Sequence, residues 1–100
     1  MIKHIVVWKL KESAGGRTAL ENAAEMRARL QALNGLVPGM GMLEVGLDIG
    51  GTPASADVAL YSEFADADAL YAYQIHPDHV AAAAYVTPMC VERILIDYEA

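Results

Sequence analysis

Hydrophobic and polar positions alternate along the first ten residues, which predicts a β-strand over Ile2 to Leu10. One face of this strand would carry Ile2, His4, Val6, Trp8 and Leu10, and the other face would carry Lys3, Ile5, Val7 and Lys9. Because the centre of the strand is apolar on both sides, we expect both of its faces to be covered.

The spacing becomes helical after the Ser13–Gly16 segment. Thr18 and, three residues later, Glu21 have the form of a capping box, which predicts a helix from this point to about Leu33. Its apolar stripe would comprise Leu20, Ala23, Ala24, Leu30 and Leu33, opposite Glu21, Asn22, Glu25 and Arg29. The Asn34-Gly35 pair predicts the end of this helix.

Two further alternating runs, Met42 to Ile49 and Val58 to Phe64, predict an antiparallel hairpin. In the first run the inward residues would be Leu43, Val45, Leu47 and Ile49. The Gly50–Ser55 segment between the runs has the composition of a loop, and it lacks the Lys-Ser/Thr ending of a phosphate-binding loop.

The last third of the chain predicts a helix in two pieces and a final strand. Asp66 is placed to cap a short helix that contains Leu70 and Tyr73. Pro77 divides this helix from a second stretch that runs to about Val86. Val91 to Tyr98 is rich in β-branched residues and predicts a strand.

The resulting order, β-α-β-β-α-β, predicts an α+β, ferredoxin-like fold with a four-stranded antiparallel sheet and helices on one face. We expect residues 1–100 to form a single domain, since the chain is too short for two cores. The face without helices would still carry apolar side chains, namely Ile5, Val7, Ala59, Tyr61, Ile94 and Ile96. A second copy would cover them by packing the same face against it, so we expect a homodimer whose two sheets close into a barrel.

Composition and charge restrict the partners. With 13 acidic and 7 basic residues, the formal charge of −6 opposes binding to nucleic acid or to an anionic membrane surface. No uncharged run reaches the roughly 20 apolar residues of a membrane span, and Ile5 to Trp8 is too brief for a signal-peptide core, so a cytoplasmic location is expected. The single cysteine, Cys90, excludes an intramolecular disulfide and suits a reducing compartment.

Candidate chemistry is concentrated around the predicted helix break. Tyr73 shares the inward face with Leu70, whereas Tyr71 points about 160° away around the helix. His79 lies in the first turn after Pro77, where the helix dipole disfavours imidazolium and so favours a neutral ring that can accept a proton.

Two neighbours modify this interpretation of the helix break. The carboxylate of Asp78 would raise the pKa of His79 and so oppose the helix dipole, which leaves the direction of the net pKa shift open. His76, directly before the proline, is expected to be a cap that bonds to the backbone.

His4 shares its strand face with Val6 and Trp8, and if this row faces the helices, His4 and His79 would converge on one cavity. The alternatives are a core histidine with a hydrogen-bond partner at position 4 and a core tyrosine whose hydroxyl reaches solvent at position 73. Arg93 could anchor a ligand carboxylate, although an ion pair with a nearby acid at the rim is the favoured alternative.

Other kinds of site have little support. A metal site at His4, His76 and His79 is disfavoured, because the last two are separated by the proline break rather than by one regular helical turn. Nucleophilic catalysis is not supported, since Cys90 has no local activating base and no serine has the context of a nucleophile elbow.

Four segments taken together resemble the stress-responsive dimeric α+β barrel family, often called Dabb. They are Met1 to Leu10, Leu36 to Gly39, Tyr73 to Val80 and Ile96 to Tyr98, and the resemblance covers nearly the whole chain. Its most specific parts are His4 and the block His76-Pro77-Asp78-His79. The resemblance implies a homodimer whose two sheets form a barrel.

The resemblance also implies roles for individual residues. One plant member of the family, olivetolic acid cyclase, closes a linear polyketide by aldol condensation with a tyrosine and a histidine of this same block. Carried over by motif, these are Tyr73 and His79, and His4 matches the pocket histidine of the first strand. His79 would remove a proton next to a carbonyl and Tyr73 would hydrogen-bond the developing enolate, with no metal or organic cofactor.

Two functions remain open. The first is a Dabb-type stress-responsive protein that binds a small, partly apolar metabolite without turnover, with His4, Val6, Trp8 and Arg93 in the binding site. The second is a cofactor-independent, polyketide-cyclase-like lyase or isomerase that uses His79 and Tyr73. A dimeric-barrel monooxygenase would share the architecture, but no specific residue supports it.

Overall fold

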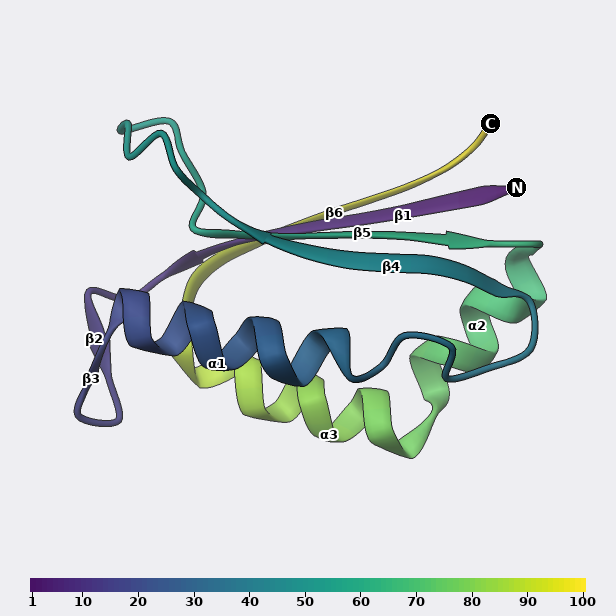
Figure 1. The fold of residues 1–100 in the computed structure, drawn as a ribbon, viewed down its shortest axis with the longest axis horizontal. Coiled ribbons are helices and arrows are strands. Elements are labelled where there is room, and N and C mark those ends of the chain that lie inside the picture. Colours follow the sequence, from purple (N-terminus) through teal and green to yellow (C-terminus); the bar gives the residue numbers. More distant parts are fainter.

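The computed structural model describes all 100 residues and contains a four-stranded antiparallel sheet with its helices on one side (Figure 1). Across the sheet, the strands lie in the order β4 (Met40–Leu47), β5 (Val58–Phe64), β1 (Ile2–Leu10) and β6 (Cys90–Glu99). The two strands at the ends of the chain are therefore neighbours. The predicted element order and the ferredoxin-like fold are confirmed.

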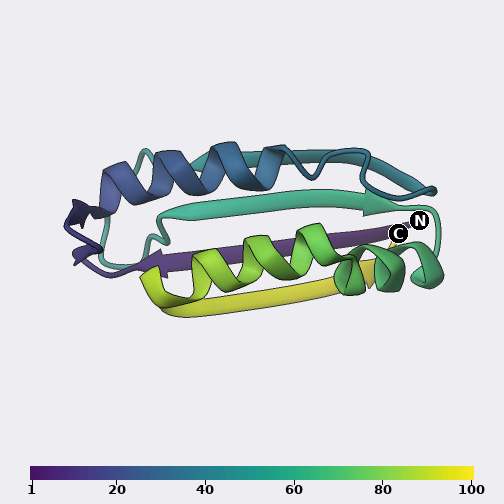
Figure 2. The ribbon, with the colours of Figure 1, turned by 90° about the horizontal axis from the view of Figure 1, so that it is seen from below.

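Three α-helices cover one face of the sheet and leave the opposite face open. They are α1 (Ala19–Gln31), α2 (Ala67–Ile75) and α3 (Pro77–Val86), and a single 3₁₀ turn, η1 (Thr87–Met89), joins α3 to β6. Figure 2 shows α1 on the side of β4 and β5 and α3 on the side of β1 and β6. None of the helices combines the length and the apolar character that a membrane crossing requires.

The predicted helix starts are confirmed by their hydrogen bonds. Thr18 Oγ1 accepts from the Glu21 N–H at 3.2 Å, and Glu21 Oε1 accepts from the Thr18 N–H at 3.0 Å, which completes the capping box. Asp66 Oδ1 accepts from the Ala69 N–H at 2.8 Å and caps α2.

The Ser13–Gly16 segment, which the sequence pattern predicts only as a break, begins a small hairpin. Its strands are β2 (Ser13–Ala14) and β3 (Arg17–Thr18). Gly15 and Gly16 form the turn with φ angles of 61° and 76°, a region in which side chains other than glycine are strained.

The buried face of α1 differs from the predicted stripe. Leu20 is 74% exposed and Ala24 is also exposed, whereas Asn22 and Met26 are buried. The hairpin makes the burial of Asn22 possible, because Asn22 Nδ2 donates to the Ala14 carbonyl at 3.1 Å and the buried amide is thereby satisfied. The buried face consists of Asn22, Ala23, Met26 and Leu30, followed by Leu33 after the helix.

The inward position predicted for Ile49 is also wrong. Strand β4 ends at Leu47, so Ile49 lies in the following loop, where it is fully exposed to solvent.

The sheet face without helices carries a row of apolar side chains, as predicted. In the β1–β6 register, Ile5 lies opposite Ile96 and Val7 lies opposite Ile94. Ile94 is 56% exposed and Ile96 is 55% exposed, because no element of the protomer covers this face. Burying side chains of this size would stabilise an assembly, since each square ångström of apolar surface removed from water contributes about 25 cal/mol.

Candidate functional site

A cavity of about 470 Å³ lies between β1, β6 and α3. All six residues that the sequence analysis singled out for a site border it: His4, Val6, Trp8, Tyr73, His79 and Arg93. The rest of the lining includes Leu30, Leu60, Ala83, Val86 and Cys90. Helix α3 forms the roof, and Val86 is its single buried residue.

Three aromatic rings from three different elements meet at one end of the cavity. Tyr73, at the end of α2, is 1% exposed, and its ring centroid lies 4.6 Å from that of His79 in α3. The centroid of His4 on β1 is 6.2 Å from that of Tyr73. The convergence of His4 and His79 on one cavity, which depended on the row of His4 facing the helices, is therefore observed.

The break between α2 and α3 makes this meeting possible. Tyr73 and His79 are six residues apart, which on an unbroken helix is about 600° and would turn their side chains roughly 120° away from each other. At the break, His76 has an extended backbone, with φ −62° and ψ 136°. Its Nδ1 accepts from the Asp78 N–H at 3.0 Å and so caps α3, as predicted.

His79 is held as a neutral ring with a free lone pair. Its Nδ1 lies 3.0 Å from the Gln74 carbonyl oxygen, and because a carbonyl only accepts, Nδ1 carries the proton. Burial lowers the pKa of His79, the Gln74 carbonyl raises it, and the charges of His4 and Arg93 lower it further. Neutral His79 therefore has Nε2 available to accept a proton.

The pKa of His79 is lowered, a direction that the opposing effects of the helix dipole and Asp78 left open in the sequence, and its main cause is burial. Asp78, which was expected to oppose the shift, has its carboxylate 4.0 Å from the ring of His76.

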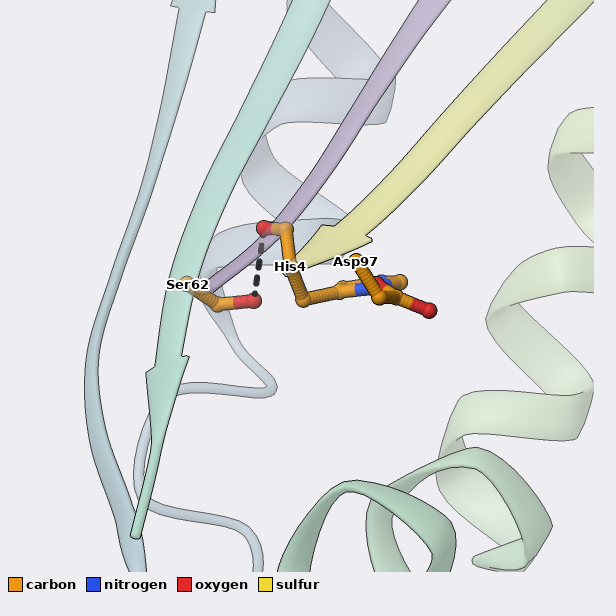
Figure 3. A network of polar contacts seen from close by, with 3 residues as sticks. All are labelled: His4, Ser62 and Asp97. Carbon is orange, nitrogen blue, oxygen red and sulfur yellow. Dashed lines mark hydrogen bonds and ion pairs between the residues drawn. The ribbon is translucent and has the colours of Figure 1, made fainter. Parts of the chain in front are cut away.

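His4 is oriented by Asp97, a residue that the sequence analysis did not select. His4 is 3% exposed, and its Nδ1 lies 2.5 Å from Asp97 Oδ1 on the neighbouring strand β6 (Figure 3). Because a carboxylate only accepts, Nδ1 carries a proton and Nε2 holds the lone pair when the ring is neutral. On the other side of β1, buried Ser62 donates to the His4 carbonyl at 3.3 Å and completes the network of Figure 3.

The Tyr73 hydroxyl is the third polar group of the cluster. It makes no hydrogen bond within the protein, yet no fully buried side-chain oxygen or nitrogen lacks a partner, so the hydroxyl is open to the cavity. Burial raises the pKa of Tyr73 to about 12. At neutral pH the phenol keeps its proton and can donate it in a hydrogen bond.

Arg93 lies at the β6 side of the cavity, opposite Trp8 in the strand register. The favoured alternative for this residue, an ion pair with a nearby acid, is wrong. The ion pairs of the protein join His4 to Asp97, Arg29 to Glu25 and His76 to Asp78, and none of them includes Arg93.

The remaining polar groups form no further centre. His76 caps α3 and does not border the cavity. No group of three or more His, Cys, Asp or Glu side chains is arranged to hold a metal ion. The Cys90 thiol borders the cavity, where burial raises its pKa and the thiol donates to the Val86 carbonyl at 3.3 Å.

Comparisons with known proteins agree on the family and the fold. Residues 2–100 match the family described as "Stress responsive A/B Barrel Domain", or Dabb. An uncharacterized protein of Streptomyces coelicolor is 33% identical over 99 residues, which cover 99% of both chains.

Among solved structures, a dimeric ferredoxin-like protein of unknown function from Thermobifida fusca superposes with a TM-score of 0.86 at 25% identity, covering 99% of this chain and 90% of that one. A dimeric protein of unknown function from Bacteroides fragilis, also with a ferredoxin-like fold, has a TM-score of 0.83 at 32% identity over 99% and 95% of the two chains.

Proposed function

The chain belongs to the stress responsive A/B barrel domain family, and from this membership and the cavity we propose that it binds a small, partly apolar metabolite between its sheet and its helices. The observation that carries the proposal is the cavity itself. Its volume of about 470 Å³ is within the range of small-molecule sites, and Val6, Trp8, Leu60 and Val86 give it an apolar wall. A few polar groups at one end, those of His4, Tyr73 and His79, would orient the ligand.

We further propose that two copies assemble through the sheet faces that carry Ile94 and Ile96. Each of these side chains is more than half exposed in the protomer, and an exposed apolar row on a sheet is unusual for a monomer. The names of the related proteins from T. fusca and B. fragilis describe them as dimeric. The cavity lies on the opposite face of the sheet, so each protomer would keep its own binding site.

Binding is tested by thermal shift with a library of metabolites and polyketide analogues. A ligand that binds only the folded protein raises the melting temperature, and at a hundred times its Kd it stabilises by about 2.7 kcal/mol. Substitutions at His4, Tyr73 and His79 should weaken the binding of any hit. Tyr71→Phe is the matched control and should leave binding unchanged, because Tyr71 lies outside the cavity and is 63% exposed. If the three cavity substitutions leave the affinity for every hit unchanged, the proposal is refuted.

A second candidate function is a cofactor-independent lyase, cyclase or isomerase. It is favoured by one observation, the 4.6 Å contact between the Tyr73 and His79 rings, with Nε2 of His79 free to accept a proton. His79 would take a proton from a carbon next to a carbonyl, and the electron pair of that C–H bond would move onto the carbonyl oxygen. The Tyr73 hydroxyl would donate a hydrogen bond to this developing enolate.

The two functions differ in turnover. Each library hit is incubated with the wild-type protein, with His79→Ala and with Tyr73→Phe, and the mixture is analysed for conversion. Conversion that both substitutions abolish, while binding and the Tyr71→Phe control persist, supports the enzyme. Binding without conversion of any hit supports the metabolite-binding protein.

A further inference from the structure

Arg93 is the only lysine or arginine among the residues that line the cavity. It lies on the same face of β6 as Asp97, and the register sets it opposite Trp8, one of the apolar wall residues. The neighbouring Glu92 also borders the cavity, but it forms no ion pair with Arg93; it lies opposite Lys9 in the register and also lines a depression with Val7 and Ile94 on the uncovered face. The guanidinium therefore has no carboxylate partner from its own strand, and no other strand or helix supplies one.

The charge of Arg93 acts on the interior of the cavity. The pKa of His79 is lowered mainly by burial and further by the Arg93 charge. In the same way, burial raises the pKa of Cys90, and the Arg93 charge opposes that rise. An unpaired positive charge that acts on both groups makes the cavity favourable for an anion beside Arg93, in a protein whose formal charge is −6.

The charge of Arg93 and the aromatic rings of His4 and Tyr73 lie at different positions along β6. Arg93 and Asp97 are four residues apart, or about 13 Å along an extended strand, and Asp97 holds His4. Side chains of the apolar wall lie between the two ends. A ligand that fills the cavity would thus contact a cation at one end, hydrocarbon in the middle, and the Tyr73 and His79 groups at the other end.

We propose that Arg93 binds the carboxylate of an amphipathic monocarboxylic acid and thereby fixes which end of the ligand lies against Tyr73 and His79. The proposal rests on the binding function above and names the class of ligand. A planar guanidinium can donate two parallel hydrogen bonds to a carboxylate, and this geometry recognises a carboxylate over an amide or an ester. The apolar body of the acid would lie against the cavity wall formed by Val6, Trp8 and Val86.

The test compares cinnamate and octanoate with their neutral primary amides, cinnamamide and octanamide, by calorimetry and heteronuclear NMR. We expect the wild-type protein to bind each acid about tenfold more tightly than its amide, a factor equivalent to about 1.4 kcal/mol. Arg93→Met should abolish this preference by weakening the binding of the acids far more than that of the amides. Arg93→Lys should retain part of the preference, since lysine keeps the positive charge but cannot donate two parallel hydrogen bonds to the carboxylate.

Arg27→Met is the matched control, because Arg27 is exposed on α1, outside the cavity, and its loss changes the net charge equally. An equal loss of preference in Arg27→Met, or an unchanged preference in Arg93→Met, would overturn the role of Arg93. Amides that bind as tightly as acids would also overturn it and leave the binding function intact. If neither acids nor amides shift the cavity resonances at millimolar concentration, the proposed ligand class fails, whereas the binding function is refuted only by the outcome of the library screen described above.

Discussion

Tyr73 and His79 belong to different helices, yet their ring centroids are only 4.6 Å apart. The ring of Tyr73 is packed in the core, whereas its hydroxyl has no partner in the protein. The two parts of this side chain therefore contribute differently to stability. The ring supports the fold, and the hydroxyl is available for a ligand.

Tyr73→Phe should accordingly be close to neutral for stability, because it removes a group that makes no internal hydrogen bond. Tyr73→Ala should cost roughly 3–5 kcal/mol of unfolding free energy, the usual range for truncating a large buried aromatic residue. Urea denaturation of the two variants measures the difference. A Tyr73→Phe variant that loses as much stability as Tyr73→Ala would mean that the hydroxyl is structural.

The pKa of His79 in the folded protein is expected below its ordinary value of 6.5, chiefly because of burial. As pH falls through 6.5, the unfolded chain takes up this proton before the folded chain does, so the contribution of His79 to stability is lost on the acid side. An NMR titration of the imidazole in the folded protein and in the urea-unfolded chain measures both values. A folded-state pKa at or above the unfolded one would contradict the expected neutral base.

Asp97→Ala removes the acceptor of the His4 Nδ1 proton and leaves a buried N–H without a partner. We expect a loss of about 1–3 kcal/mol of unfolding free energy, the usual cost of an unsatisfied buried donor. Asp97→Asn should recover much of this loss, because its side-chain oxygen can still accept. Glu99→Ala, at an exposed position of the same strand, is the control, and an equal effect of both alanine substitutions would refute the role of Asp97.

Gly39 is required for both its backbone angle and its close packing. Its φ is +85°, and a Cβ at this position would lie 2.9 Å from the Cβ of Ala69 in α2. Gly35 has a similar φ of +75° but no atom within 4 Å of its added Cβ. Both alanine substitutions should suffer the backbone penalty of roughly 1–2 kcal/mol, and Gly39→Ala should lose about 1–3 kcal/mol more through overpacking. Equal melting temperatures of the two variants would exclude the close contact as a cause.

The proposed dimer predicts that charge on the uncovered sheet face separates the protomers. Ile94→Asp combined with Ile96→Asp would place two carboxylates in the interface and should convert the protein to a monomer in sedimentation experiments. Ile49→Asp alters an equally apolar residue that is fully exposed in a loop, and it should leave the mass unchanged. A wild-type protein that sediments as a monomer at high concentration would refute the assembly.

Local sequence signals were sufficient for most of the fold. The alternation over Val58 to Phe64 defined β5 with its observed bounds, and Pro77 marked the start of α3. Such signals succeed where one residue type has one strong local consequence, such as a capping box or a proline that interrupts a helix. The predicted inward position of Ile49 was wrong because the alternation of apolar and polar residues does not show where a strand leaves the sheet.

The parts of the site that were missed depend on contacts between distant segments. Asp97 orients His4 only because β6 pairs with β1 in one particular register, and the sequence pattern alone did not determine that register. Asn22 can be buried because its side-chain amide donates to the Ala14 carbonyl, a contact that no helical periodicity could indicate. The lack of an ion-pair partner for Arg93 is likewise a property of the assembled structure.

The weak anchoring of α3 has a consequence for how a ligand reaches the cavity. Val86 is the only fully buried residue of this helix, and Ala82 and Tyr85 are partly buried, so α3 loses less apolar contact on detaching than α1 would and should open more often than the whole protein unfolds. Its amide hydrogens should therefore exchange with deuterium sooner than those of α1, which has four buried residues. Entry and exit through this transient opening would require no permanent channel, and a bound ligand would slow the exchange of α3 specifically.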